Sequence, residues 1–139
     1  MATQLQEKFN VSDPEQAWGV VSDISKLVGC VPGAKVLEAE GPTKAKAEIK
    51  VDMGSMAMTF SGPVEIVSKD DGSKTAKFKA QAKEAGGQSN ADGDVTITIG
   101  GDGGTVDVSA NVSGKAASMG EGTVVAVLTQ LVKQFAAAI

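Results

Sequence analysis

The sequence predicts an α+β fold in which a curved antiparallel sheet of seven strands surrounds a long C-terminal helix, with two short helices after the first strand. Two observations carry this prediction. Between residues 43 and 112, five stretches alternate apolar and polar residues, which is typical of antiparallel strands with one solvated and one covered face. From Lys115 onward the apolar period changes to about 3.6, the repeat of an amphipathic helix.

The N-terminal segment predicts a strand and then two short helices. Residues 3–11 alternate and form the strand. Residues 12–15, Ser-Asp-Pro-Glu, start a helix, because they offer a capping oxygen, a proline for the first turn and an acid near the positive end of the helix dipole. A second helix is expected over 24–28. The turn Val31-Pro32-Gly33-Ala34 then leads into a strand over 34–40.

The five alternating stretches supply the remaining strands. Short turns rich in Gly, Pro and Asp separate them, so strands that follow one another along the chain are expected to be neighbours in the sheet. Of the 26 inward positions, ten are Ala, Gly or Ser, so the covered face is shallow. Such a face lets its cover approach closely or leaves a hollow. The inward positions lie at 45–53, 56–66, 76–84, 89–99 and 106–112.

The C-terminal helix carries an apolar stripe of Val124, Val127, Leu128, Leu131 and Phe135. A helix of about 20 to 24 residues, or about 30 to 36 Å, is long enough to lie across the sheet. A curved antiparallel sheet that grips such a helix is the helix-grip arrangement, which commonly encloses a cavity. With 139 residues, the chain is expected to form one domain, residues 1–139.

Composition excludes several classes of function. The formal net charge of −4, without a basic cluster, argues against nucleic-acid binding. The chain has no His and no Tyr, so a histidine-based triad or zinc site is excluded, and neither a catalytic nor a metal site is expected. Cys30 is the one cysteine and is expected to be a small buried hydrophobe, which fits a reducing cytoplasm. No apolar run reaches the length that spans a bilayer.

Two local features leave an alternative to weigh. Glu84 falls on an inward position, where it lies either at a solvated strand end or at the rim of a cavity, orienting a ligand's polar head. The glycine cluster at 100–104 precedes a strand and opens no helix, so it predicts a hairpin turn and not a phosphate-binding loop.

Several short motifs together resemble the CoxG family, that of the carbon monoxide dehydrogenase G subunit, within the START/Bet v 1-like (SRPBCC) helix-grip superfamily. The resemblance implies a non-enzymatic accessory of aerobic carbon monoxide dehydrogenase and related oxidoreductases, linked to the membrane and to transfer of a quinone. It also implies contact with the inner face of the cell membrane through a tail absent from this chain. The motifs are Val31-Pro32-Gly33-Ala34, Phe60-Ser61-Gly62-Pro63-Val64, Gly114-Lys115, Met119-Gly120 and Phe135.

We therefore predict a carrier that holds a hydrophobic ligand, with no covalent cofactor, between the sheet and the C-terminal helix. The resemblance implies that the ligand is a long-chain quinone such as menaquinone and that the partner is a carbon monoxide dehydrogenase-type enzyme. An empty apolar hollow of about 300 Å³ would cost about 7 kcal/mol, so it is expected to collapse, take water or hold something apolar. The alternatives are a docking module that recruits the dehydrogenase to the membrane without an internal ligand and, least favoured, an enzyme acting on a polyketide-like ring.

The residues expected around the ligand fall into two groups. Methionines are common core fillers, so Met53, Met56 and Met58 form either plain core or a soft ligand-binding patch. The two short helices, with the turn at Pro32-Gly33, are expected to gate the mouth through Trp18, Leu27 and Val28. The expected wall residues are Met53, Met58, Phe60, Phe78, Ala80, Val95, Ile97, Val108, Ala110, Met119, Val124 and Leu128.

Overall fold

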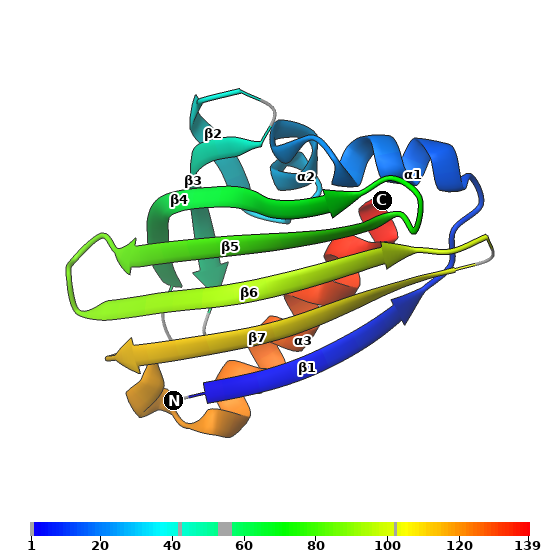
Figure 1. The fold of residues 1–139 in the computed structure, drawn as a ribbon. Helices are drawn as coiled ribbons and strands as arrows, with labels where there is room; N and C mark the ends of the chain where they lie inside the picture. The colour runs from blue at the N-terminus through cyan, green and yellow to red at the C-terminus, as the bar shows by residue number, and fades with distance from the viewer. Residues whose placement is uncertain (1, 42, 53–56, 102) are drawn as a thin grey trace.

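An open antiparallel sheet forms one layer of the molecule, and a long helix crosses behind it (Figure 1). The structure is a computed structural model that describes residues 2–41, 43–52, 57–101 and 103–139, apart from the side chain of Met119. In chain order the elements are β1 (Ala2–Phe9), α1 (Pro14–Val21), α2 (Ile24–Gly29), β2 (Ala34–Ala39), β3 (Lys44–Asp52), β4 (Ala57–Asp70), β5 (Thr75–Glu84), β6 (Ser89–Ile99), β7 (Gly104–Gly114), the 3₁₀ helix η1 (Ala117–Met119) and α3 (Glu121–Ala138).

The strand order confirms the predicted meander. Within the described residues, seven strands pair in the order β1-β7-β6-β5-β4-β3-β2, and every pair is antiparallel. β1 returns to pair with β7 in a continuous register from Ala2↔Asn111 to Phe9↔Gly104. β1 and β2 are therefore the two edges. The sheet is the predicted seven-stranded one, although β1 ends two residues earlier than the alternation suggests.

The predicted division into an inward and an outward face is confirmed on β3. Ala45 and Val51 are buried, whereas Lys46 and Lys50, on alternate positions, are exposed. The same register places Glu48 beside β2, where its carboxylate lies 3.2 Å from the ammonium of Lys35. The period of two thus sorts side chains between core and solvent as expected.

Gly62 meets a steric requirement of the sheet. A Cβ at this inward position would overlap the carbonyl oxygen of Gln81 on the neighbouring strand β5. Pro63, which follows it, has no N–H to donate to a ladder. The Gly62-Pro63 step is therefore a place where β4 and β5 approach too closely for a side chain, and the motif around it has a structural role.

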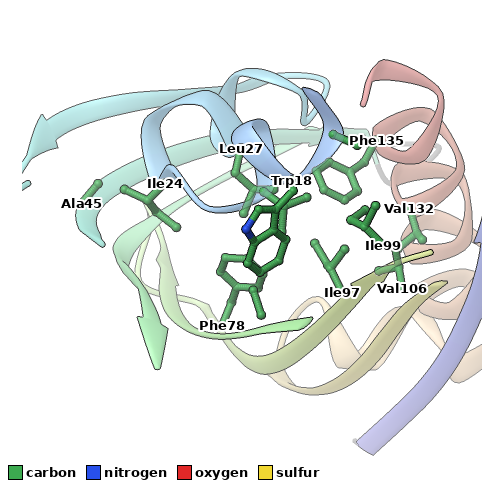
Figure 2. Close-up of a cluster of buried hydrophobic side chains, with 13 residues drawn as sticks. Trp18, Ile24, Leu27, Ala45, Phe78, Ile97, Ile99, Val106, Val132 and Phe135 are labelled. Atoms are coloured by element: carbon green, nitrogen blue, oxygen red, sulfur yellow. The ribbon is translucent and has the colours of Figure 1, made fainter. Parts of the chain in front are cut away.

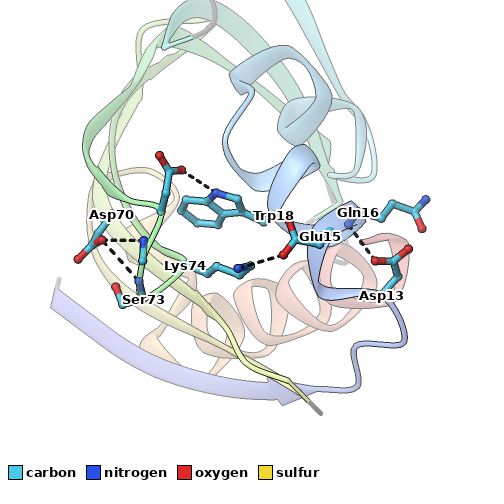
Figure 3. Close-up of polar contacts among 9 residues, drawn as sticks. Asp13, Glu15, Gln16, Trp18, Asp70, Ser73 and Lys74 are labelled. Atoms are coloured by element: carbon cyan, nitrogen blue, oxygen red, sulfur yellow. Dashed lines mark hydrogen bonds and ion pairs between the residues drawn. The ribbon is translucent and has the colours of Figure 1, made fainter.

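The short helix α1 begins as predicted, with Asp13 as its capping residue. The carboxylate of Asp13 accepts a hydrogen bond from the backbone N–H of Gln16 at 3.2 Å, and Pro14 occupies the first turn (Figure 3). α2 is capped in the same way, because the side chain of Asp23 accepts hydrogen bonds from the backbone N–H groups of Ser25 and Lys26. Each cap satisfies amides that have no partner inside the helix.

Two contacts tie α1 to the hairpin between β4 and β5 (Figure 3). The indole N–H of Trp18 donates to the carboxylate of Asp71 at 2.8 Å. The ammonium of Lys74 lies 3.2 Å from the carboxylate of Glu15. This hairpin therefore positions the short helices over one end of the sheet.

The C-terminal helix is shorter than predicted. α3 has 18 residues, which is about 27 Å, and begins at Glu121 and not near Lys115. Gly114 and Gly120 have φ of 84° and 98°, values that interrupt regular structure, and the segment between them contains η1. The expectation of 20 to 24 helical residues was therefore wrong, because the two glycines confine the start of the helix.

The buried side chains form two clusters at opposite ends of α3. The larger cluster joins α1 and α2 to the C-terminal half of α3 and to the sheet, and it contains Trp18, Ile24, Phe78, Ile97 and Phe135 (Figure 2). The smaller cluster surrounds the N-terminal half of α3 and consists of Val51, Met58, Phe60, Val112, Ala116 and Val124.

Candidate ligand-binding chambers

Two apolar cavities lie between α3 and the inward face of the sheet. We call the cavity beside α2 the larger chamber; its volume is about 230 Å³. Strands β4 to β7 form its floor, while α2 and the C-terminal half of α3 cover it. Its lining residues are Leu27, Val28, Val31, Val64, Phe78, Ala80, Val95, Ile97, Val106, Val108, Leu131, Val132 and Phe135.

The smaller chamber, of about 170 Å³, lies toward the start of α3. Leu131 lines both chambers, so one side chain stands where they meet. Among the residues that the structure describes, no polar side chain contributes to either lining. The residues around the smaller chamber are Ile49, Val51, Phe60, Ala82, Ala91, Val112, Ala116, Val124, Val127, Leu128 and Leu131.

The chambers exist because the sheet offers small side chains where the helix stands away from it. Ala80, Ala82 and Ala91 are inward residues of β5 and β6, yet each stays only half-buried. α3 makes its closest approach to the sheet at the edge strand β1. The central strands therefore leave a space under the helix that their methyl groups do not fill.

A third hollow, which we call the vestibule, opens along the seam between β3 and α3. Its volume is about 460 Å³. It shares Val51 and Val127 with the smaller chamber and Leu131 with both chambers. Unlike them it has polar residues in its lining, which consists of Pro32, Gly33, Lys50, Val51, Asp52, Ala126, Val127, Gln130, Leu131 and Gln134.

The turn before β2 forms one wall of the vestibule. Gly33 has a φ of 79°, and a Cβ there would lie 2.7 Å from the carbonyl oxygen of Lys50. The backbone N–H of Lys50 donates to the carbonyl oxygen of Gly33 at 3.0 Å. Glycine is thus required for this turn to close against β3, at the place where the sequence suggested the mouth of a cavity.

Most of the residues predicted to form the wall, and two of those predicted to gate the mouth, do line the chambers, although their binding role stays a prediction. Seven line the larger chamber: Leu27, Val28, Phe78, Ala80, Val95, Ile97 and Val108. Phe60, Val124 and Leu128 line the smaller chamber. Met53 lies outside the described residues, as does the side chain of Met119.

Three predicted residues line neither chamber. Trp18 is 8% exposed and belongs to the larger core cluster (Figure 2). Its indole N–H is directed to Asp71 (Figure 3). Met58 is 3% exposed and packs in the smaller cluster. Ala110 pairs with Gly93 on the inward face.

Sequence reasoning left other lining residues unassigned, although the signals for them were present. Ile49, Val64, Ala82 and Val112 occupy inward positions of the alternating strands. Leu131 belongs to the apolar stripe of the helix. The patterns identified these faces but did not indicate which part of each face stays uncovered.

The titratable groups considered from sequence lie outside the chamber linings. Glu84 ends β5, and its carboxylate accepts a hydrogen bond from the N–H of Gln88 at 3.3 Å, across the turn to β6. Cys30 is half-buried, and its thiol lies 3.7 Å from the carbonyl oxygen of Ala138. Desolvation by burial raises the pKa of the Cys30 thiol, which disfavours the reactive thiolate.

Metal binding and membrane crossing find no support in the described part of the chain. No group of three or more Cys, Asp or Glu side chains there is arranged to hold a metal ion. In the same residues, no helix combines the length and the apolar character needed to cross a bilayer.

The sheet and the helix across it, with apolar chambers between the two layers, define a Bet v 1-like helix-grip domain. The chain belongs to the CoxG family, that of the carbon monoxide dehydrogenase G subunit, whose model matches residues 8–139. No curated protein gives a significant match to the sequence.

Solved structures with the same fold support this class. A conserved protein from Geobacillus kaustophilus has a TM-score of 0.75 and 20% identity, over 99% of this chain and 91% of that one. The Zhui aromatase/cyclase from Streptomyces sp. R1128 has a TM-score of 0.65 and 12% identity, over 99% of this chain and 91% of that chain. Ginseng major latex-like protein 151 from Panax ginseng has a TM-score of 0.58 and 12% identity, over 99% of this chain and 97% of that chain. At these identities the likeness shows the fold alone.

Proposed function

We propose that the protein carries a hydrophobic ligand, a long-chain quinone such as menaquinone, in the two chambers and exchanges it with a carbon monoxide dehydrogenase-type or related oxidoreductase. The observation that carries this proposal is the pair of chambers that meet at Leu131 and whose described lining residues are all apolar. The family to which the chain belongs supplies the partner enzyme.

The cost of an empty chamber supports an occupant. At about 24 cal/mol per Å³, a dry and empty chamber of 230 Å³ would cost about 5.5 kcal/mol. A whole domain is stable by only about 5 to 15 kcal/mol. An apolar tail in the chamber removes this cost and gains about 25 cal/mol for each Å² that it takes from water. No charged anchor is needed for such binding.

No titratable group lines the chambers in the described part of the chain, which supports a carrier and not an enzyme. General acid–base chemistry needs a titratable side chain within hydrogen-bond reach of the substrate. Every described side chain that lines either chamber is apolar, and the sequence contains no His and no Tyr. Glu84 lies outside both linings and is engaged with Gln88.

The direct test is to isolate the protein from its own host without detergent, measure its mass by native mass spectrometry and extract it with organic solvent. We expect about one quinone or related apolar lipid per chain in the extract. The delipidated protein should then take up added menaquinone-4 with a rise in its melting temperature, since a ligand that binds only the folded state stabilises it. An extract without quinone or lipid, together with no uptake of added quinone by the protein, would refute the carrier function. Such protein, if it still bound the dehydrogenase, would support a docking module instead.

A further inference from the structure

We propose that the ligand enters along the seam between β3 and α3 and that its polar head stays in the vestibule, where the side-chain amides of Gln130 and Gln134 bind it by hydrogen bonds. This inference rests on the proposed function, because it concerns the same chambers. It assigns a head-group site and an entrance, neither of which follows from the apolar linings alone.

The packing of α3 indicates which side of the helix is open. On one flank of its apolar stripe, Val132 and Ala136 are buried, and it is at β1 that the helix comes closest to the sheet. On the other flank, Gln130 and Gln134 are exposed and line the vestibule with β3. The helix is therefore held to the sheet along one edge and open along the opposite edge.

The open edge leads directly into both chambers. Val51 and Val127 line the vestibule and the smaller chamber, and Leu131 lines all three hollows. An apolar tail that enters at the seam would meet these three side chains first. Leu131 is then the side chain around which the tail must pass to occupy the larger chamber.

The described lining of the two chambers offers no polar side chain to which a polar head group could hydrogen-bond. A carbonyl or hydroxyl group moved into either of them would lose its hydrogen bonds to water without replacement, which strongly disfavours its burial there. The head must therefore remain where donors are available. Of the three connected hollows, the vestibule is the one whose described lining includes polar residues.

The two glutamines are placed to act together. They are four residues apart on α3, so they lie on the same face of the helix, next to Val127 and Leu131. Within the described residues, neither side-chain amide has a hydrogen-bond partner. Each NH₂ group can donate two hydrogen bonds to an acceptor such as a quinone carbonyl.

The charges in the vestibule favour a neutral head group. The charged residues that border the vestibule, Lys50 and Asp52, carry opposite signs and lie on outward positions of β3, so they add no net charge to it. A fatty acid carboxylate would find no excess of positive charge there. We therefore infer a neutral lipid whose head carries hydrogen-bond acceptors.

The test compares three probes on the delipidated full chain: menaquinone-4, the head-less hydrocarbon squalene, and arachidonate. The variant is Gln130→Leu with Gln134→Leu, and the control is Lys133→Leu, which places the same side chain at an exposed position of α3 that lines none of the three hollows. We expect the wild type to bind menaquinone-4 more tightly than arachidonate. In the double variant, menaquinone-4 affinity should fall about 5- to 30-fold, the equivalent of one or two neutral hydrogen bonds, while squalene affinity stays within about twofold.

A spectroscopic readout separates head recognition from packing. Hydrogen bonding lowers the carbonyl stretching frequency of a bound quinone, so this frequency should rise in the double variant and stay unchanged in Lys133→Leu. An equal loss of menaquinone-4 and squalene, or no loss of either, would overturn the head-group assignment. If the wild type binds none of the probes, the carrier function itself has failed, and this inference fails with it.

Discussion

Replacing Ala80 with phenylalanine tests whether the larger chamber is a real void. Ala80 is a half-buried inward residue of β5, flanked by Val64 on β4 and Gly93 on β6, and its methyl group faces the chamber. A phenyl ring at this position would occupy part of the 230 Å³ available. It would thereby compete with the ligand for the same space.

The sign of the stability change decides between a chamber and a close-packed core. Burial of a phenyl ring in an unoccupied apolar space is worth about 1.5 to 3 kcal/mol, so the ligand-free variant should be more stable than the ligand-free wild type by about 1 to 3 kcal/mol. Forcing the same ring into a filled core would instead cost about 1 to 3 kcal/mol. The affinity for menaquinone-4 should fall at least tenfold.

The assay is urea unfolding of delipidated protein, followed by the fluorescence of Trp18, the one tryptophan of the chain. The control is Ala39→Phe, which adds the same ring at an exposed position at the end of β2 and should change stability by no more than about 0.5 kcal/mol. If Ala80→Phe destabilised the protein by more than about 1 kcal/mol and left ligand binding intact, the chamber would not be a binding space.

Three further predictions concern single positions. Gly62→Ala should lower the free energy of unfolding by about 1 to 3 kcal/mol, because the new methyl group would overlap the carbonyl oxygen of Gln81. Trp18→Phe should cost about 0.5 to 1.5 kcal/mol through loss of the hydrogen bond to Asp71, with ligand affinity unchanged, as measured by thermal unfolding and titration. Cys30 should react with iodoacetamide more slowly than a free cysteine at neutral pH and speed up only in alkaline solution, because burial raises the pKa of its thiol.

Each of these predictions has a contrary outcome. Gly19→Ala is the matched control for Gly62→Ala, since a Cβ at this helical position meets nothing within 4 Å and should be neutral or stabilising. Equal stability of the two glycine variants would refute the steric argument. A loss of ligand affinity in Trp18→Phe would show that Trp18 contributes to the binding site. Alkylation of Cys30 at the rate of a free thiol would contradict its burial.

The strands and their faces were predictable because they depend on local geometry. Successive side chains of a strand point to opposite faces, so the alternation was enough to separate the buried Ala45 and Val51 from the exposed lysines of β3. The Asp13-Pro14 start of α1 was predictable for the same reason, since capping is settled within one turn.

The start of α3 shows where periodicity was insufficient. The apolar repeat continues upstream of Glu121, but Gly114 and Gly120 adopt positive φ and place a 3₁₀ turn between them. A glycine in the sequence shows that the backbone can adopt unusual conformations, but it does not predict which conformation the folded chain adopts. At Gly114 the surroundings require glycine, because a Cβ there would overlap the backbone carbonyl oxygen of Gln88.

The composition of the chambers was only partly predictable. Ala80 and Ala110 look equivalent in the sequence, since both are small inward residues of alternating strands. Ala80 lines the larger chamber and Ala110 does not. The difference depends on where α3 crosses the sheet, which no local pattern encodes.

The sequence by itself determined the order of the elements, the inward face of each strand and the apolar stripe of the last helix, because these follow from the two- and 3.6-residue repeats of the chain. The tertiary structure alone decided which inward residues stay uncovered, that Trp18 reaches Asp71 and not a cavity, and that Gln130 and Gln134 border an opening. The physical reason is that α3 lies closest to β1, an arrangement set by contacts between residues far apart in the chain.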